Sequence, residues 1–181
     1  MNKRTITIWA VRIILIALII WWMTVIFGFS AEDGQQSQSL SDRITIKVVK
    51  VIYPDYDSLT LASQKMHFNK ISFLVRKTGH FGEYGILGIL WSVFLLSFGR
   101  GRGLKYRIFT GISVFICMIY ASTDEFHQGF VDGRSPKVMD VVIDTCGALI
   151  GVLIILIIRY IFERKIWVHF RRKHEYLGTE H

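Results

Sequence analysis

Four long apolar runs, separated by polar segments, form the main pattern of this chain. They cover approximately residues 6–29, 81–98, 108–124 and 138–161. An α-helix of about 20 apolar residues crosses the hydrocarbon core of a bilayer. The pattern therefore predicts an all-α membrane bundle of four transmembrane helices, built as a single domain over residues 1–181.

The connection between the first two runs, residues 30–78, is the longest one. Residues 30–40 predict a polar link, whereas residues 41–53 fit both an alternating strand and an amphipathic helix that begins at Ser41. A lone strand at a membrane surface leaves its backbone unpaired, so an interfacial helix is favoured. Residues 62–77 predict a second amphipathic helix that runs into the second span.

The composition supports a membrane protein. The chain is 51% hydrophobic, and its mean hydropathy is +0.38. It is therefore too apolar for an ordinary soluble domain. The net charge of +8 does not indicate nucleic-acid binding, because the basic residues cluster beside the ends of the apolar runs. Cys117 and Cys146 both lie inside apolar runs, and we expect them to be small core residues rather than a disulfide framework.

The basic residues also predict the orientation. Lys3 and Arg4 precede the first run, a basic segment at 99–107 joins the second and third runs, and a basic tail follows the fourth. The positive-inside rule places all three segments in the cytoplasm, together with both termini. The 30–78 loop and the short 125–137 loop are then expected on the outer side.

The first run resembles the start of a secretory signal peptide, because it follows a short basic segment. It is longer than the apolar core of a typical signal peptide and is interrupted by Arg12. The small residues before Asp33 offer a cleavage site after Ala31. We favour a retained span over a cleaved leader.

Ionisable side chains gather at one end of each of the last three spans. Threading the spans back and forth places these ends on the same side of the membrane, where charged groups usually pair or line a polar cavity. Asp140, Asp144, Gly147 and Gly151 share one face of the fourth span, and the two glycines allow a neighbouring helix to approach closely. The sequence predicts a shallow polar pocket that opens outward.

The residue types suggest a role for each member of this pocket. Imidazole and carboxylate groups suit acid–base chemistry, and they also suit Mg²⁺, Mn²⁺ or Zn²⁺, so a divalent metal is left open. A structural ion-pair network is the alternative. The candidate catalytic residues are His80, Glu83, Asp124, Glu125 and Asp144, and the candidate substrate-binding residues are Lys77, Tyr84, Gln128, Arg134 and Asp140.

Two blocks of the chain carry a family resemblance. The segment RKTGHFGEYGILG at 76–88 and the segment STDEFHQGFVDGRSPKVMDVVIDTCGALIG at 122–151 are similar to the VanZ-like family of bacterial membrane proteins. One departure is VDGR at 131–134, where many members have a proline before the GR pair. The resemblance implies a cell-envelope membrane protein of a Gram-positive bacterium, in a family whose namesake is associated with resistance to the glycopeptide teicoplanin.

Two functions fit these observations. In one, the protein is an enzyme or transferase acting on an envelope molecule at the outer leaflet, such as a lipid-linked cell-wall precursor. In the other, it is a non-catalytic scaffold, sensor or binder of an amphiphile such as a lipoglycopeptide, and its polar cluster is a binding pocket or a purely structural network. Membrane lipids are expected partners in both, nucleic acid in neither, and the sequence leaves a homodimer open.

Overall fold

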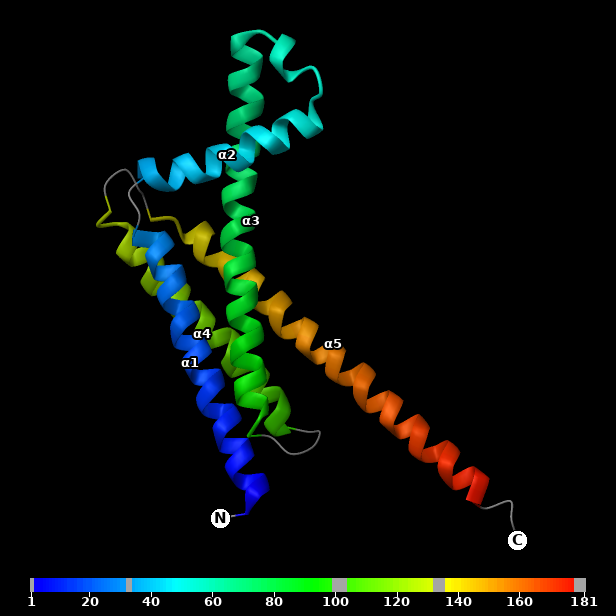
Figure 1. Ribbon diagram of the computed structural model, residues 1–181. Helices are drawn as coiled ribbons and strands as arrows, with labels where there is room; N and C mark the ends of the chain where they lie inside the picture. Colours follow the sequence, from blue (N-terminus) through cyan, green and yellow to red (C-terminus); the bar gives the residue numbers. More distant parts are fainter. Residues whose placement is uncertain (1, 32–33, 99–103, 132–135, 178–181) are drawn as a thin grey trace.

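Five α-helices and one short 3-10 helix make up the described part of the computed structural model (Figure 1). The structure describes the backbone of residues 2–31, 34–98, 104–131 and 136–177, and the side chains of residues 2–31, 41–98, 107–131 and 136–164. In chain order the elements are α1 (Lys3–Ala31), α2 (Gly34–Ile52), η1 (Tyr56–Ser58), α3 (Leu61–Leu96), α4 (Leu104–Gln128) and α5 (Val138–Leu177). No strand occurs in these residues.

Four of the helices are long and apolar enough to cross a membrane, which confirms the predicted all-α bundle of four spans. These spans are Lys3–Ala31, Leu61–Leu96, Arg107–Gln128 and Val138–Arg164. Apolar side chains such as Ile13, Ile14 and Trp21 are exposed on the outside of the bundle, as expected for a surface that meets lipid rather than water. The protein is therefore a multi-pass membrane protein.

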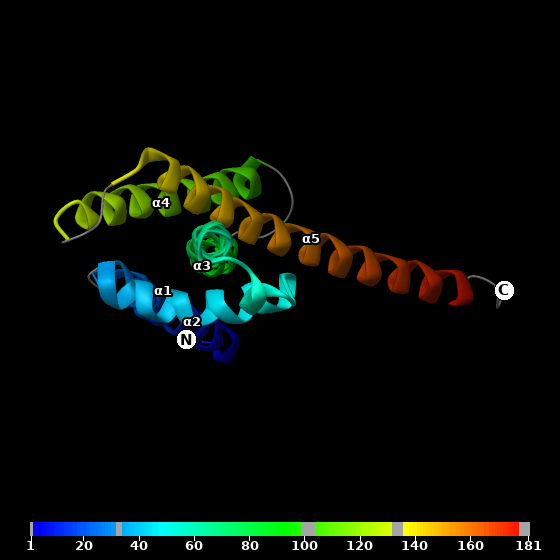
Figure 2. The same ribbon diagram turned by 90° about the horizontal axis from the view of Figure 1, so that it is seen from above.

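The central helix of the bundle is α3. Figure 2 shows it end-on, with α1 on one side and α4 and α5 on the other, and it packs against each of them. With 36 residues and a rise of ~1.5 Å per residue, α3 is about 54 Å long, well beyond a hydrocarbon core of about 30 Å. Its first turns project from the bundle beside α2, as the sequence predicts for an amphipathic helix that continues into the second span (Figure 1).

The connection between α1 and α3 is more helical than the sequence indicates. The helical reading of residues 41–53 is confirmed, but α2 begins at Gly34 instead of at Ser41, so much of the predicted 30–40 link is helix. A turn at Tyr53 and Pro54 leads into η1, and the ring of Tyr53 lies 4.1 Å from that of His67. The result is a helical hairpin in which α2 lies across α3 (Figures 1 and 2).

The closest contact in the bundle is the crossing of α3 and α5. A Cβ atom added at Gly147 would overlap the carbonyl oxygen of Phe81, and one added at Gly151 would overlap that of Gly85. A Cβ at Gly88 would likewise overlap the backbone of Ala148. The predicted glycine pair of the fourth span therefore brings two helix backbones into direct contact, and its partner helix is α3.

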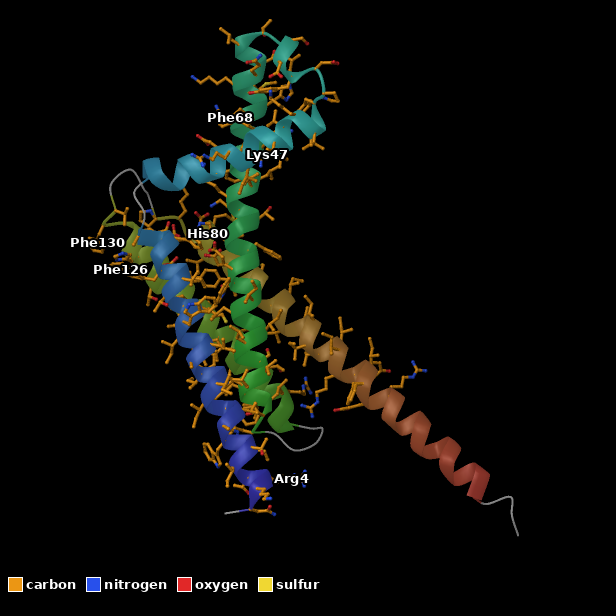
Figure 3. The ribbon with its side chains drawn as sticks, viewed as in Figure 1. Arg4, Lys47, Phe68, His80, Phe126 and Phe130 are labelled. Atoms are coloured by element: carbon orange, nitrogen blue, oxygen red, sulfur yellow. The ribbon has the colours of Figure 1, made fainter. Side chains whose placement is uncertain are left out.

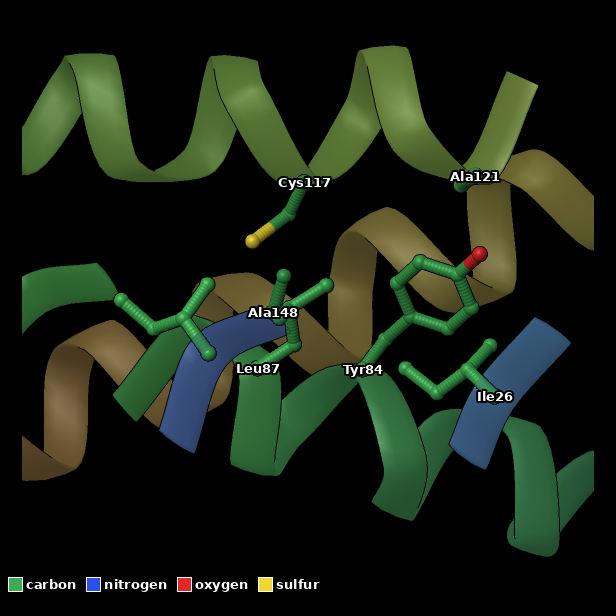
Figure 4. Packing of buried hydrophobic residues seen from close by; sticks show 7 residues of the cluster. Ile26, Tyr84, Leu87, Cys117, Ala121 and Ala148 are labelled. Carbon is green, nitrogen blue, oxygen red and sulfur yellow. The ribbon is translucent and has the colours of Figure 1, made fainter. Parts of the chain in front are cut away.

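The core beside this crossing is small and mostly apolar. Figure 4 shows Tyr84 and Leu87 of α3 packed between Ile26 of α1, Cys117 of α4 and Ala148 of α5. Cys117 is buried here as expected, but Cys146 is exposed on the outside of α5, so the prediction of a core position is wrong for that cysteine. Position 146 lies about 100° around α5 from Gly147, and only the glycine faces α3.

The charge inside the first span has local partners. The guanidinium of Arg12 donates to the carbonyl oxygen of Ser97 at 2.8 Å and to its hydroxyl at 3.1 Å, and it lies 3.8 Å from the ring centroid of Phe98. Ser97 is the C-cap of α3, where carbonyl groups lack helical partners. Arg12 therefore joins the first half of α1 to the end of α3.

The close crossing predicts that Gly151→Ala destabilises the fold. The added methyl group meets backbone that cannot move aside, so we expect a loss of about 1–3 kcal/mol in the free energy of unfolding. The matched control is Gly82→Ala on α3, where a Cβ meets no atom within 4 Å. Thermal unfolding in detergent measures both variants, and equal melting temperatures for the two would contradict the crossing.

Candidate functional site

The predicted polar residues come together at the end of the bundle where α1 ends and α5 begins. They lie on the middle of α3, on the last turns of α4, and on the first two turns of α5. Figure 3 shows His80 at this level, below α2. Asp144 is six residues beyond the start of α5, or about 9 Å into the bundle. We call these residues the polar cluster: Lys77, His80, Glu83, Tyr84, Asp124, Glu125, Gln128, Asp140 and Asp144.

An ion pair links α3 to the start of α5. The ammonium group of Lys77 bonds a carboxylate oxygen of Asp140, and both side chains are about four-fifths buried. Asp140 lies in the first turn of α5, where a negative charge also interacts favourably with the helix dipole. The structure thus gives both residues a structural role, whether or not they bind a substrate.

Glu125 has a structural partner as well. Its carboxylate accepts a hydrogen bond of 2.6 Å from the backbone N–H of Lys137, immediately before α5 begins at Val138. Helix N-termini leave N–H groups without helical partners, and a carboxylate there satisfies one of them. Glu125 therefore joins the end of α4 to the start of α5.

Two further contacts lie within single helices. The Gln128 side chain donates to Asp124 Oδ2 at 3.3 Å, one turn along α4, and both residues are buried. On α3, His80 Nδ1 lies 3.8 Å from Glu83 Oε2, which is an ion-pair distance rather than a hydrogen bond. The two side chains are three residues apart and therefore lie on one face of the helix.

Tyr84 and Asp144 form the deepest part of the cluster. Tyr84 is 0% exposed and Asp144 is 2% exposed. The Tyr84 hydroxyl and Asp144 Oδ1 are fully buried, and neither has a hydrogen-bond partner among the described residues. A buried polar group without a partner costs about 1–3 kcal/mol, so these two atoms are the part of the cluster that the fold alone does not explain.

The surroundings of these two atoms are acidic. The carboxylates of Asp124, Asp140, Glu125 and Glu83 all interact electrostatically with Asp144. All four of these carboxylates have the partners described above. Figure 4 shows the hydroxyl of Tyr84 pointing toward α4 near Ala121, on the side of α3 where α4 and α5 converge.

The structure also assigns roles to side chains that the sequence did not single out. The indole N–H of Trp22 on α1 donates to the backbone carbonyl of Glu83 at 2.9 Å, and the Tyr120 hydroxyl on α4 donates to the Met23 carbonyl at 2.7 Å. These bonds fix α1 at the level of the polar cluster. The sequence carries no clear signal for either bond, because both acceptors are backbone carbonyls on other helices.

His127 was not among the candidate residues, and its imidazole stacks on Phe27 of α1, with 4.6 Å between ring centroids. Arg134 lies outside the described residues. Within the described part of the chain, no three His, Cys, Asp or Glu side chains gather closely enough to hold a metal ion.

The fold and the cluster define a class: a four-span membrane protein with a buried, mostly acidic cluster at one end of the bundle. A family model described as VanZ/LLP1 matches residues 15–159, which include the second and third spans, most of the first and fourth, and the whole cluster. The chain belongs to the VanZ/LLP1 family. Comparisons with curated proteins and with solved structures gave no match.

The Lys77–Asp140 pair predicts a measurable coupling between α3 and α5. Lys77→Met or Asp140→Asn alone leaves the partner charge without its counterion in a largely buried place, so each is expected to cost about 1–3 kcal/mol. The double variant is expected to recover part of this loss. Thermal unfolding of the four proteins in a double-mutant cycle measures the coupling.

The exposed pair Lys50–Asp57 is the control for this cycle. Its atoms are 2.7 Å apart, but its side chains are 49% and 73% exposed, so its removal is expected to cost less than about 1 kcal/mol. Strictly additive effects of Lys77→Met and Asp140→Asn would show that the two residues do not interact.

Proposed function

We propose that this VanZ/LLP1 protein acts in the cell envelope, where its polar cluster binds a lipid-linked or amphiphilic envelope molecule. The supporting observation is the pair of buried polar atoms, the Tyr84 hydroxyl and Asp144 Oδ1, that have no partner in the described part of the protein. Both lie on helices held together by a glycine crossing, so they form a rigid place for a ligand.

The chemistry of these atoms favours a particular kind of ligand group. A carboxylate accepts hydrogen bonds, whereas a phenol hydroxyl both donates and accepts. A ligand hydroxyl or amino group therefore satisfies Tyr84 and Asp144 together. A phosphate fits less well at this depth, because four further carboxylates interact with Asp144. The sugar or amino part of an envelope amphiphile is the proposed contact, with its apolar tail in the surrounding lipid.

The orientation belongs to the same proposal. Lys3, Arg4 and the basic tail that follows the fourth span support a cytoplasmic location for both termini. α1 begins at the end of the bundle opposite the cluster, so the cluster then faces the outer leaflet (Figure 1). A ligand at the outer leaflet is consistent with a contribution to teicoplanin resistance, the phenotype associated with the family's namesake.

Catalysis is a second candidate, and a structural network is a third. A general base would have to come from the imidazole and carboxylate groups of the cluster, and His80, whose Nδ1 lies 3.8 Å from Glu83 Oε2, is the residue type most often used for that role. The Lys77–Asp140 and Glu125–Lys137 contacts favour the structural reading for those residues. Neither contact accounts for Tyr84 or Asp144.

Two tyrosines provide the sharpest test of the proposal. Tyr84→Phe removes a hydroxyl without a described partner, so we expect unchanged or higher thermal stability and a loss of about 1–3 kcal/mol in ligand binding. Tyr120→Phe removes a hydroxyl that bonds Met23, so we expect about 1 kcal/mol lower stability and retained function.

The measurement is teicoplanin susceptibility of a sensitive Gram-positive host that expresses each variant at matched membrane levels. Wild type and Tyr120→Phe are expected to protect, and Tyr84→Phe and Asp144→Asn are expected to fail. Protection by all four proteins would assign the cluster a structural role. Failure of wild type would separate this protein from the family's resistance phenotype.

A further inference from the structure

The outward face of α2 has no role in the function proposed above. α2 packs against α3 through a stripe of small or polar side chains: Ser41, Thr45 and Val49 are all buried. The hydroxyl of Thr45 bonds the carbonyl of Ser41 in its own helix. An amphipathic helix usually turns its apolar stripe toward its own protein. Because α2 turns a different stripe toward α3, its exposed apolar side chains need another surface to cover them.

Four apolar side chains of α2 form an arc at the edge of the buried stripe. At about 100° per residue, Ile44, Val48, Val51 and Ile52 fall within an arc of about 100°. Val48 is half-buried, and the other three are exposed, Val51 by 81%. The described part of the chain leaves this arc uncovered.

The charged residues of α2 are arranged around this arc. The basic residues Arg43, Lys47 and Lys50 lie next to the arc, on its side away from α3. Asp42 lies about 130° from the centre of the arc. Lys50 pairs with Asp57, but Arg43 and Lys47 are exposed. Going around α2, the face that contacts α3 is therefore followed by the apolar arc, then by the basic residues, and then by Asp42.

The position of α2 in the fold fits a helix that lies on a bilayer surface. α2 begins at Gly34, just after the spanning helix α1 ends at Ala31, and it lies across the direction of the spans (Figures 1 and 2). A helix in this position lies along the membrane surface. With α3 on its flank, its apolar arc faces the hydrocarbon and its basic side lies level with the lipid headgroups.

We propose that α2 is a membrane-surface helix whose apolar arc inserts into the boundary between headgroups and acyl chains, while Arg43 and Lys47 bind anionic lipid headgroups. This interaction does not depend on the ligand of the polar cluster. It fixes the depth of that cluster, because α2 packs directly on α3, the helix that carries Lys77, His80, Glu83 and Tyr84.

Depth-dependent fluorescence quenching of the full chain in vesicles tests this proposal. A single cysteine at position 51 or at position 46 carries an NBD label in a Cys146→Ser background, since Cys117 is buried. Both native residues are β-branched, apolar and exposed, but Ile46 lies roughly opposite the arc. The vesicles contain phosphatidylcholine with or without phosphatidylglycerol, and the quenchers are a nitroxide lipid and aqueous dithionite.

The expected result is severalfold stronger quenching by the nitroxide lipid at position 51 than at position 46, with the opposite order for dithionite. Phosphatidylglycerol is expected to increase the difference, and Arg43→Gln with Lys47→Gln is expected to remove that increase. Equal quenching at both positions would overturn the proposal. Protection of position 51 from both quenchers would also overturn it and would indicate a protein partner or a second copy on this face.

Discussion

The contact between the backbones of α3 and α5 is the constraint on which the rest of the structure depends. Gly85, Gly88, Gly147 and Gly151 leave no side chain between the two helices at their crossing. In a membrane, where apolar side chains gain little from burial against each other, close backbone packing is a main source of helix association. This crossing places Asp144, three residues before Gly147, directly at the level of Tyr84, one residue before Gly85.

Near this crossing, two groups of residues in the polar cluster differ in whether they have partners. Lys77, Asp140 and Glu125 hold the start of α5 against α3 and α4 through an ion pair and a hydrogen bond to a helix N-terminus. Tyr84 and Asp144 lie deeper and have no such partner in the described chain. The cluster thus combines contacts that hold the helices together with two deeper polar atoms, the Tyr84 hydroxyl and Asp144 Oδ1, that lack a described partner. These two atoms are the physical basis for a ligand site.

The sequence predicted much of this, and the physical reasons differ from element to element. Helical periodicity placed Asp140, Asp144, Gly147 and Gly151 on one face of the fourth span. The structure confirms that face, because both glycines lie directly against the backbone of α3. Periodicity did not reveal that α2 starts at Gly34, since residues 34–39 contain no apolar side chain and therefore show no apolar periodicity. Nor did it reveal the bonds of Trp22 and Arg12, whose partners are backbone carbonyls and a cap residue 61 and 85 positions away.

The most direct test of the central claim is mass spectrometry of the amphiphiles that co-purify with the protein from a Gram-positive membrane. We predict that one hydroxyl- or amine-bearing species is enriched with wild type in a defined ratio, is retained by Tyr120→Phe, and is lost from Tyr84→Phe and Asp144→Asn. An identical lipid complement on all four proteins, each folded to the same degree, would contradict the claim that Tyr84 and Asp144 form a binding site.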